Sequence, residues 1–78
     1  MRLSRHARSN IKLYDINEDD IRKTIEVPDI IAKEGVKTIA IRKFEGKYSG
    51  YPLKVVYEKI EEELVVITTY PLKKKLWR

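Results

Sequence analysis

The side chains of this sequence that could do chemistry are cationic or aromatic. The 78 residues include one histidine, His6, and no cysteine, which excludes a Cys-based zinc site and a site built from several histidines of one chain. Cleavage of RNA without a metal needs a base for the 2′-hydroxyl, cations for the phosphorane charge and an acid for the leaving oxygen. The predicted catalytic residues are His6, Tyr70 and Lys73, and Arg8 and Arg42 could serve the same phosphate.

His6 lies near the start of a predicted helix, where it could act in two ways. Ser4 is a good N-cap residue, so His6 falls in the first helical turn. It could be a catalytic base. The favoured interpretation is a partly buried ring that anchors the helix to the sheet through a backbone group or the Thr69 hydroxyl, because a lone histidine is a weak catalytic signal.

Arg5 and Arg8 flank this histidine and are unusual at the start of a helix. Cations in the first turn oppose the helix dipole, at a cost of about 0.3–1 kcal/mol each. A bound phosphate would offset this cost, since N-terminal N–H groups and guanidinium groups both bind anions. The alternatives are ion pairs with the acidic run 61–63, or solvation at the surface.

Positive charge is concentrated at the two ends of the chain. The net charge is +5, from 17 basic and 12 acidic residues, and residues 1–13 and 71–78 each carry four cations and no acid. The two ends form one basic face if the fold brings them together, and are otherwise two solvated tails. Trp77 could stack on a base or pack on the protein itself. The predicted nucleic-acid-binding residues are Arg5, Arg8, Arg42, Lys74, Lys75, Trp77 and Arg78.

Two helices are predicted in the first third of the chain. The first follows Ser4 as "RHARSNIKLY" and ends at Asp15, a residue that tolerates the left-handed conformation found just beyond helices. Asn17 caps the second helix, whose first turn is acidic, and Pro28 prevents its continuation.

After Pro28 the apolar pattern becomes that of strands. The segments "DIIAK", "TIAIRKF", "PLKVVYE" and "LVVITTY" have the β-branched or alternating composition of strands, and "EGKYSGYP" is a glycine-punctuated loop. We therefore predict an α+β fold in which two N-terminal helices pack on a three- to four-stranded antiparallel sheet.

The order of these elements resembles a small uncharacterised prokaryotic family. The residues that carry the resemblance are the pair His6-Ala7 on the first helix and the closing element Thr68-Thr69-Tyr70-Pro71. The family looks like a relative of the RelE/ParE-type toxins, so the resemblance implies a single RelE/ParE-like domain over residues 1–78. RelE-like proteins cleave ribosome-bound messenger RNA and are held inactive by an antitoxin, whereas ParE-like proteins act on gyrase.

Two functions are therefore expected from different classes. The first is a metal-free endoribonuclease, or a ribosome- or RNA-binding toxin of a toxin–antitoxin pair, with RNA or the ribosome and an antitoxin protein as partners. The second is a non-catalytic RNA- or protein-binding module on the same scaffold. Neither function needs a metal or another cofactor, and the sequence leaves the oligomeric state open.

Composition predicts where the protein works. No apolar run approaches the roughly 20 residues needed to cross a bilayer, and no signal peptide follows Met1, so we expect a cytoplasmic protein with no membrane partner. Abundant Lys, Glu and Ile, with no Gln, are compatible with a thermophilic source.

Overall fold

The first helix begins and ends where the sequence predicts. In the computed structural model, which describes residues 1–73, α1 spans Arg5–Tyr14. The Ser4 hydroxyl oxygen accepts a hydrogen bond from the Ala7 N–H at 3.0 Å, which satisfies one of the donors left free at a helix start. Asp15 closes the helix in the left-handed conformation, with φ 54°.

The second helix, α2, spans Glu18–Glu26 and also follows the prediction. The Asn17 side chain accepts from the Asp19 N–H at 2.8 Å. Glu18, Asp19 and Asp20 fill the first turn, where carboxylates complement the positive end of the helix dipole. The helix stops at Val27, next to Pro28.

The predicted sheet is wrong in its strand count and its direction. The sheet is five-stranded and mixed, with the order β1-β5-β4-β3-β2. The additional strand is β1, at Arg2–Leu3, which pairs in parallel with Val65 and Val66 of β5. A two-residue strand has no apolar period, so sequence patterns cannot identify it. The other strands are β2 (Ile30–Glu34), β3 (Lys37–Arg42), β4 (Leu53–Ile60) and β5 (Glu63–Pro71), paired antiparallel in chain order.

Tight turns fix the register of the hairpins. Gly35 and Val36 connect β2 to β3, and Gly35 takes a φ of +65°, as the first central position of a type II′ turn requires. Glu61 and Glu62 connect β4 to β5, and both have positive φ, as in a type I′ turn. Two members of the acidic run 61–63 therefore form a charged turn, and the third, Glu63, begins β5. A register shift at Val56/Tyr57 further along this pair marks a β-bulge.

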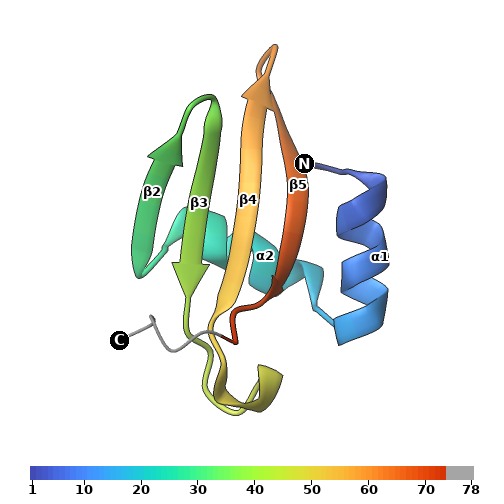
Figure 1. Ribbon diagram of the computed structural model, residues 1–78, viewed down its shortest axis with the longest axis vertical. Helices are drawn as coiled ribbons and strands as arrows, with labels where there is room; N and C mark the ends of the chain where they lie inside the picture. Colours follow the sequence, from blue (N-terminus) through green and yellow to red (C-terminus); the bar gives the residue numbers. More distant parts are fainter. Residues whose placement is uncertain (74–78) are drawn as a thin grey trace.

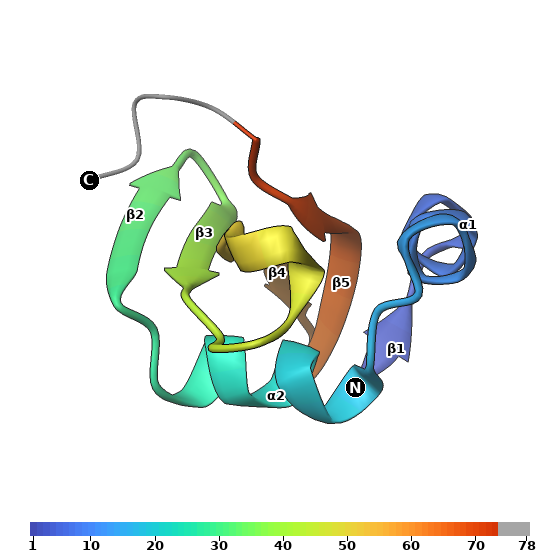
Figure 2. The same cartoon turned by 90° about the horizontal axis from the view of Figure 1, so that it is seen from below.

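The two helices occupy different positions relative to the sheet. Figure 1 shows α2 behind the sheet, where it packs on β3 and β4. Figure 2 shows α1 beside the sheet, next to β5. The prediction that both helices pack on the sheet face is thus wrong for α1, which covers an edge. The core between these elements contains Ala7, Ile16, Ile21, Leu53, Val55 and Val66.

Candidate functional site

Three cations on α1 are exposed, as the sequence predicts for a nucleic-acid contact. We call Arg5, Arg8 and Lys12 the α1 basic face. Arg5 and Arg8 lie in the first turn of α1, where the helix dipole opposes cations. The same turn contains no acid that could balance them. The ion pair expected with the acidic run 61–63 is made by Arg2 instead, whose Nη1 lies 3.5 Å from a Glu63 carboxylate oxygen. Among residues 1–73, no ion pair involves a member of the α1 basic face.

The members of this face differ in their surroundings. At about 100° per residue, Arg5 and Lys12 lie roughly 140–160° around the helix from Ala7, which is fully buried. They therefore point to solvent. Arg8 lies nearer the protein and lines an open pocket of about 450 Å³ that Glu18 and Glu63 also line. Arg5 and Lys12 are consequently the cations that a large polyanion reaches most easily.

His6 is not the anchor that the sequence suggested. Its side chain is exposed, and the Thr69 hydroxyl instead donates to the Lys54 carbonyl oxygen at 2.9 Å. The anchors of α1 are other polar residues. The Ser4 hydroxyl donates to the Ile67 carbonyl oxygen at 2.6 Å. Asn10 Nδ2 donates to Thr68 Oγ1 at 3.4 Å.

The three predicted catalytic residues are not joined by any direct contact. Tyr70 is half-buried on β5, and the Lys73 ammonium lies 5.7 Å from the Tyr51 ring centroid. No hydrogen bond or ion pair within residues 1–73 links His6, Tyr70 and Lys73. Their catalytic role stays a prediction.

The contact between Asn10 and Thr68 indicates how far apart His6 and Tyr70 lie. α1 and β5 run in the same direction (Figure 1). His6 precedes Asn10 by four residues, about 6 Å along a helix. Tyr70 follows Thr68 by two residues, about 7 Å along a strand. His6 and Tyr70 therefore lie on opposite sides of the Asn10–Thr68 contact along the two elements. This separation is unfavourable for proton transfer by both residues at one phosphate.

Arg42 does not join the α1 basic face. It lies on β3, and its Nη1 donates to the carbonyl oxygen of Val27 at the end of α2, at 2.7 Å. Its guanidinium carbon lies 5.5 Å from the Phe44 ring centroid, in cation–π range. Arg42 therefore ties α2 to the sheet. The predicted contacts Lys74, Lys75, Trp77 and Arg78 lie outside the described residues.

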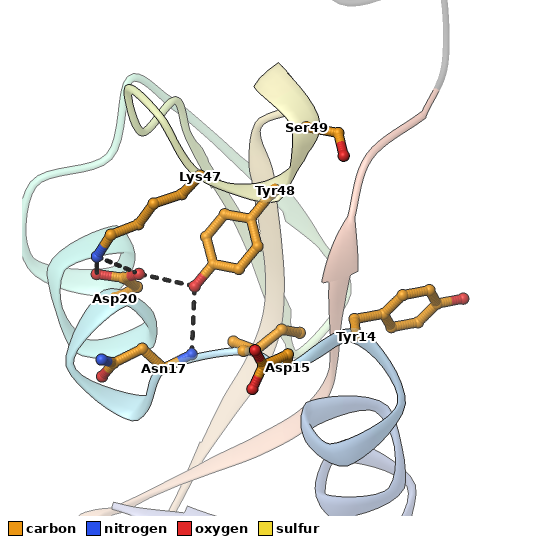
Figure 3. Close-up of a pocket in the computed structure, with 8 residues that line it drawn as sticks. Tyr14, Asp15, Asn17, Asp20, Lys47, Tyr48 and Ser49 are labelled. Atoms are coloured by element: carbon orange, nitrogen blue, oxygen red, sulfur yellow. Dashed lines mark hydrogen bonds and ion pairs between the residues drawn. The ribbon is translucent and has the colours of Figure 1, made fainter.

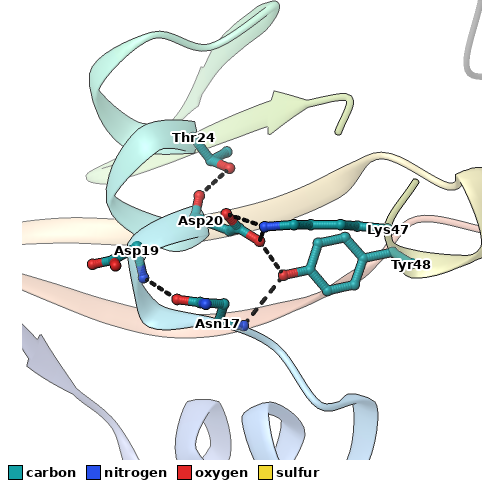
Figure 4. A network of polar contacts seen from close by, with 6 residues as sticks. All are labelled: Asn17, Asp19, Asp20, Thr24, Lys47 and Tyr48. Atoms are coloured by element: carbon teal, nitrogen blue, oxygen red, sulfur yellow. Dashed lines mark hydrogen bonds and ion pairs between the residues drawn. The ribbon is translucent and has the colours of Figure 1, made fainter. Parts of the chain in front are cut away.

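A partly buried polar network lies where the two helices meet the long loop (Figure 3). The Asp20 side chain is 7% exposed, and its oxygens lie 3.0 and 3.2 Å from the Lys47 ammonium. The Tyr48 hydroxyl donates to Asp20 Oδ2 at 2.7 Å and accepts from the Asn17 N–H at 3.2 Å (Figure 4). One phenol thus connects the loop to the start of α2.

Backbone conformation supports a constrained loop at this position. Tyr48 and Ser49 both have a φ of 54° in the short 3-10 turn Tyr48–Gly50. Non-glycine residues adopt positive φ at a cost, so the surrounding contacts must hold them there. The loop borders an open pocket of about 630 Å³, which is lined by Tyr14, Asp15, Ile16, Asn17, Asp20, Lys47, Tyr48 and Ser49.

The network is already satisfied and offers no free acid or base. Burial raises the pKa of Tyr48 to about 12; the N–H of Asn17 opposes this shift and the Asp20 carboxylate adds to it. Tyr48 is therefore a neutral phenol at pH 7 and donates to Asp20. The Asp20 charge is paired with Lys47, so we interpret these three residues as a clamp on the loop.

The sequence held one partial signal for this clamp. In sequence, Asp20 is one of the acids in the first turn of α2, where the dipole explains it, and Tyr48 is one residue of the loop "EGKYSGYP". However, Asp20 and Thr24 are one turn apart and both are buried, with the Thr24 hydroxyl donating to the Asp20 carbonyl oxygen at 2.7 Å (Figure 4). Polar residues on the apolar stripe of a helix indicate a buried polar partner elsewhere in the chain.

Comparison with protein families gives a match over most of the chain. Residues 3–71 match the family model described as a domain of unknown function, DUF4258. The chain belongs to the DUF4258 family. Comparison with curated proteins and with solved structures gave no match. Within residues 1–73 of this DUF4258 protein, no cluster of three or more His, Cys, Asp or Glu side chains could hold a metal ion, and no helix is long and apolar enough to span a membrane.

Proposed function

We propose that this DUF4258 protein binds RNA without cleaving it, through phosphates that contact the α1 basic face. The observation that carries the proposal is the exposure of Arg5, Arg8 and Lys12 along one helix that has no acid in its first turn. Arg5 and Arg8 oppose the helix dipole and have no ion-pair partner within residues 1–73, so a bound anion would offset the cost of their position, whereas Lys12 lies in the last turn, where the dipole favours a cation. A chain of phosphates supplies such anions at regular intervals.

A second candidate is a metal-independent endoribonuclease, or ribosome-targeted toxin, that an antitoxin protein controls. The observation in its favour is that His6 and Tyr70 belong to α1 and β5, two elements that pack together. The spacing between His6 and Tyr70 argues against it, as does the lack of a contact to Lys73. We therefore place it second.

Salt-dependent binding tests the RNA proposal. A labelled single-stranded RNA should bind with an affinity that falls with salt, and each phosphate contact contributes about −0.7 to the logarithmic slope. Arg5→Ala combined with Lys12→Ala should flatten this slope by about 1.4. The matched control is Lys23→Ala, which removes an exposed cation from α2 and should leave the slope unchanged. Equal slopes in all three proteins would exclude the α1 basic face as the RNA contact.

Cleavage assays separate the two candidates. The wild-type protein, incubated with RNA and with translating ribosomes, should give no new 5′ or 3′ ends, and its expression should not arrest growth. If ends do appear and single changes of His6, Tyr70 or Lys73 to Ala abolish them in folded protein, the endoribonuclease is the correct function.

A further inference from the structure

The β2 strand forms an open edge of the sheet. It is the last strand in the sheet order, and within residues 1–73 no other segment pairs with its outer side. All five of its residues, Ile30–Glu34, are exposed. Figure 2 shows β2 at the opposite end of the sheet from α1. An uncovered antiparallel edge of this kind is a template for another strand.

The open edge is also unusually apolar. Of the nine exposed large apolar side chains in the described residues, four lie between positions 27 and 36. Ile30 and Ile31 are 43% and 56% exposed, on opposite faces of β2. Monomeric proteins usually protect a free edge with charges or cover it, so exposed isoleucines on an edge strand indicate an interaction surface.

Hairpin geometry identifies the backbone groups that this edge presents. A two-residue turn leaves Glu34 and Lys37 as a hydrogen-bonded pair. Since bonded and non-bonded positions alternate in an antiparallel ladder, Ile30 and Ala32 also bond to β3. Ile31 and Lys33 then direct their backbone N–H and C=O groups away from the sheet, toward a neighbour.

We propose that β2 pairs antiparallel with β2 of a second copy of this chain, so that two sheets become one. The pairing axis passes through Ile31, which lies opposite Ile31 of the second copy. Ile30 is then opposite Ala32 of the second copy. Asp29 precedes β2, and its N–H and its carboxylate bond the Ile41 carbonyl oxygen and the Lys43 N–H, each at 2.8 Å, so the paired segment begins at Ile30.

Side-chain matching selects this register. Residues opposite each other in an antiparallel pair share a face, so the central residue must face itself. With Ala32 at the centre, Ile30 would oppose Glu34 and Ile31 would oppose Lys33. With Ile31 at the centre, Ile31 opposes Ile31 and Ile30 opposes Ala32, so apolar side chains meet apolar side chains, a combination that stabilises cross-strand pairs. Self-complementarity of this kind favours a second copy over an unrelated strand.

The first test measures mass in solution against protein concentration. The wild-type chain should sediment as a dimer at high concentration and dissociate on dilution. Ile31→Lys places two lysines opposite each other and should raise the dissociation constant by at least about tenfold, which corresponds to about 1.4 kcal/mol. The matched control is Ile60→Lys, an exposed isoleucine at the far end of β4 (42% exposed), which should dissociate like the wild type. A wild-type monomer at all concentrations, or equal loss in both variants, overturns the proposal.

Cysteine cross-linking tests the register directly, because the chain has no cysteine of its own. A hydrogen-bonded antiparallel pair has a Cα–Cα distance of about 5.5 Å, which a disulfide can span. Under mild oxidation Ile31→Cys should form a covalent dimer faster than Ala32→Cys and much faster than Ile60→Cys. Faster cross-linking of Ala32→Cys overturns the proposed register, and equal rates for all three overturn edge pairing altogether. RNA binding does not enter either measurement, so the result is independent of the proposed function.

Discussion

The two edges of this sheet differ in how far other elements cover them. The β5 edge is covered along its length: β1 pairs with Val65 and Val66, and α1 packs alongside the rest of the strand. Within residues 1–73 no segment pairs with the outer side of β2, and each of its five residues is exposed. β5 contains four buried residues, whereas β2 contains none.

This difference follows from where the two helices pack. The first 14 residues form β1 and α1, and both lie at β5. α2 packs on β3 and β4, so it covers the middle of one sheet face. The described part of the chain thus provides two α-helices for a five-stranded sheet, and all five residues of β2, the strand farthest from α1, stay exposed. Stability should therefore depend on the β5 edge, and association on the β2 edge.

Truncation at the two edges should produce the largest contrast. Val66→Ala removes two buried methyl groups from beneath α1 and should lower the free energy of unfolding by about 2–3 kcal/mol, from lost burial and the cavity left behind. Ile31→Thr keeps a β-branched side chain at an exposed position and should change the free energy of unfolding by less than about 0.5 kcal/mol. Urea denaturation at protein concentrations that favour the monomer measures both values. Equal losses would mean that β2 is packed in solution and that the contrast between the edges is wrong.

Removal of the Ser4 side chain should give the next largest effect. Ser4→Ala loses the bond to the Ala7 N–H and the bond to the Ile67 carbonyl oxygen, at a cost of about 1–2 kcal/mol. Ser4→Thr keeps the hydroxyl and should retain most of that stability. The control at α2 is Asn17→Ala, which loses only an exposed cap and should cost no more than about 1 kcal/mol. If Ser4→Ala unfolds no more easily than Asn17→Ala, the link from α1 to β5 does not hold the covered edge.

The helix ends and the turn at Gly35 could be predicted from sequence because local signals specify them. Ser4, Asp15 and Asn17 act on neighbouring residues, and Gly35 needs only its own φ, so short-range patterns reveal the helix ends and the turn. The edges could not be predicted in this way. β1 has two residues, and its pairing with Val65 and Val66 spans over 60 positions of sequence. A segment too short to have a period gives no sign of a parallel partner.

The residues of the candidate site differ in the same way: local sequence predicts some of them and not others. The exposure of Arg5 and Arg8 could be predicted because both are charged residues in the first turn of a short helix, and their position against the dipole is visible in sequence. The role of Arg42 could not be, because its partner is a backbone carbonyl at the end of α2. The clamp between Asp20, Lys47 and Tyr48 joins positions 27 and 28 residues apart. No local rule connects such residues.

Alkaline pH should weaken the helical side of the molecule selectively. The folded state raises the pKa of Tyr48 from its ordinary 10.0 to about 12, so folding favours the neutral phenol. Its contribution is complete below pH 10 and is lost as pH rises through about 12. Tyr48→Phe should lower the free energy of unfolding by about 1 kcal/mol at pH 7, because the hydrogen bonds of the phenol are lost. The variant should lack the fall in stability that the wild type shows between pH 10 and 12.

The control for the pH experiment is another tyrosine. Tyr51→Phe, at a position that is 40% exposed, should follow the wild-type pH dependence of unfolding. Urea denaturation at each pH measures the free energy of unfolding, and hydrogen exchange at neutral pH should show faster opening near Asn17 in Tyr48→Phe, because the Asn17 N–H bonds the Tyr48 oxygen. Parallel pH curves for wild type and Tyr48→Phe would show that the phenol does not titrate with folding.

The smallest effect should come from the bond between Asn10 and Thr68. At 3.4 Å it is long, and Asn10→Ala also improves helix propensity by several tenths of a kcal/mol, so the single change should be close to neutral. A double-mutant cycle with Thr68→Val removes the propensity term and should give a coupling energy of about 0.5 kcal/mol. The same cycle between Asn10 and Thr38, which lies on β3, should give none. Because Asn10 is the one α1 side chain that bonds a β5 side chain, zero coupling in both cycles would mean that the covered edge is held by Ser4 and apolar packing alone.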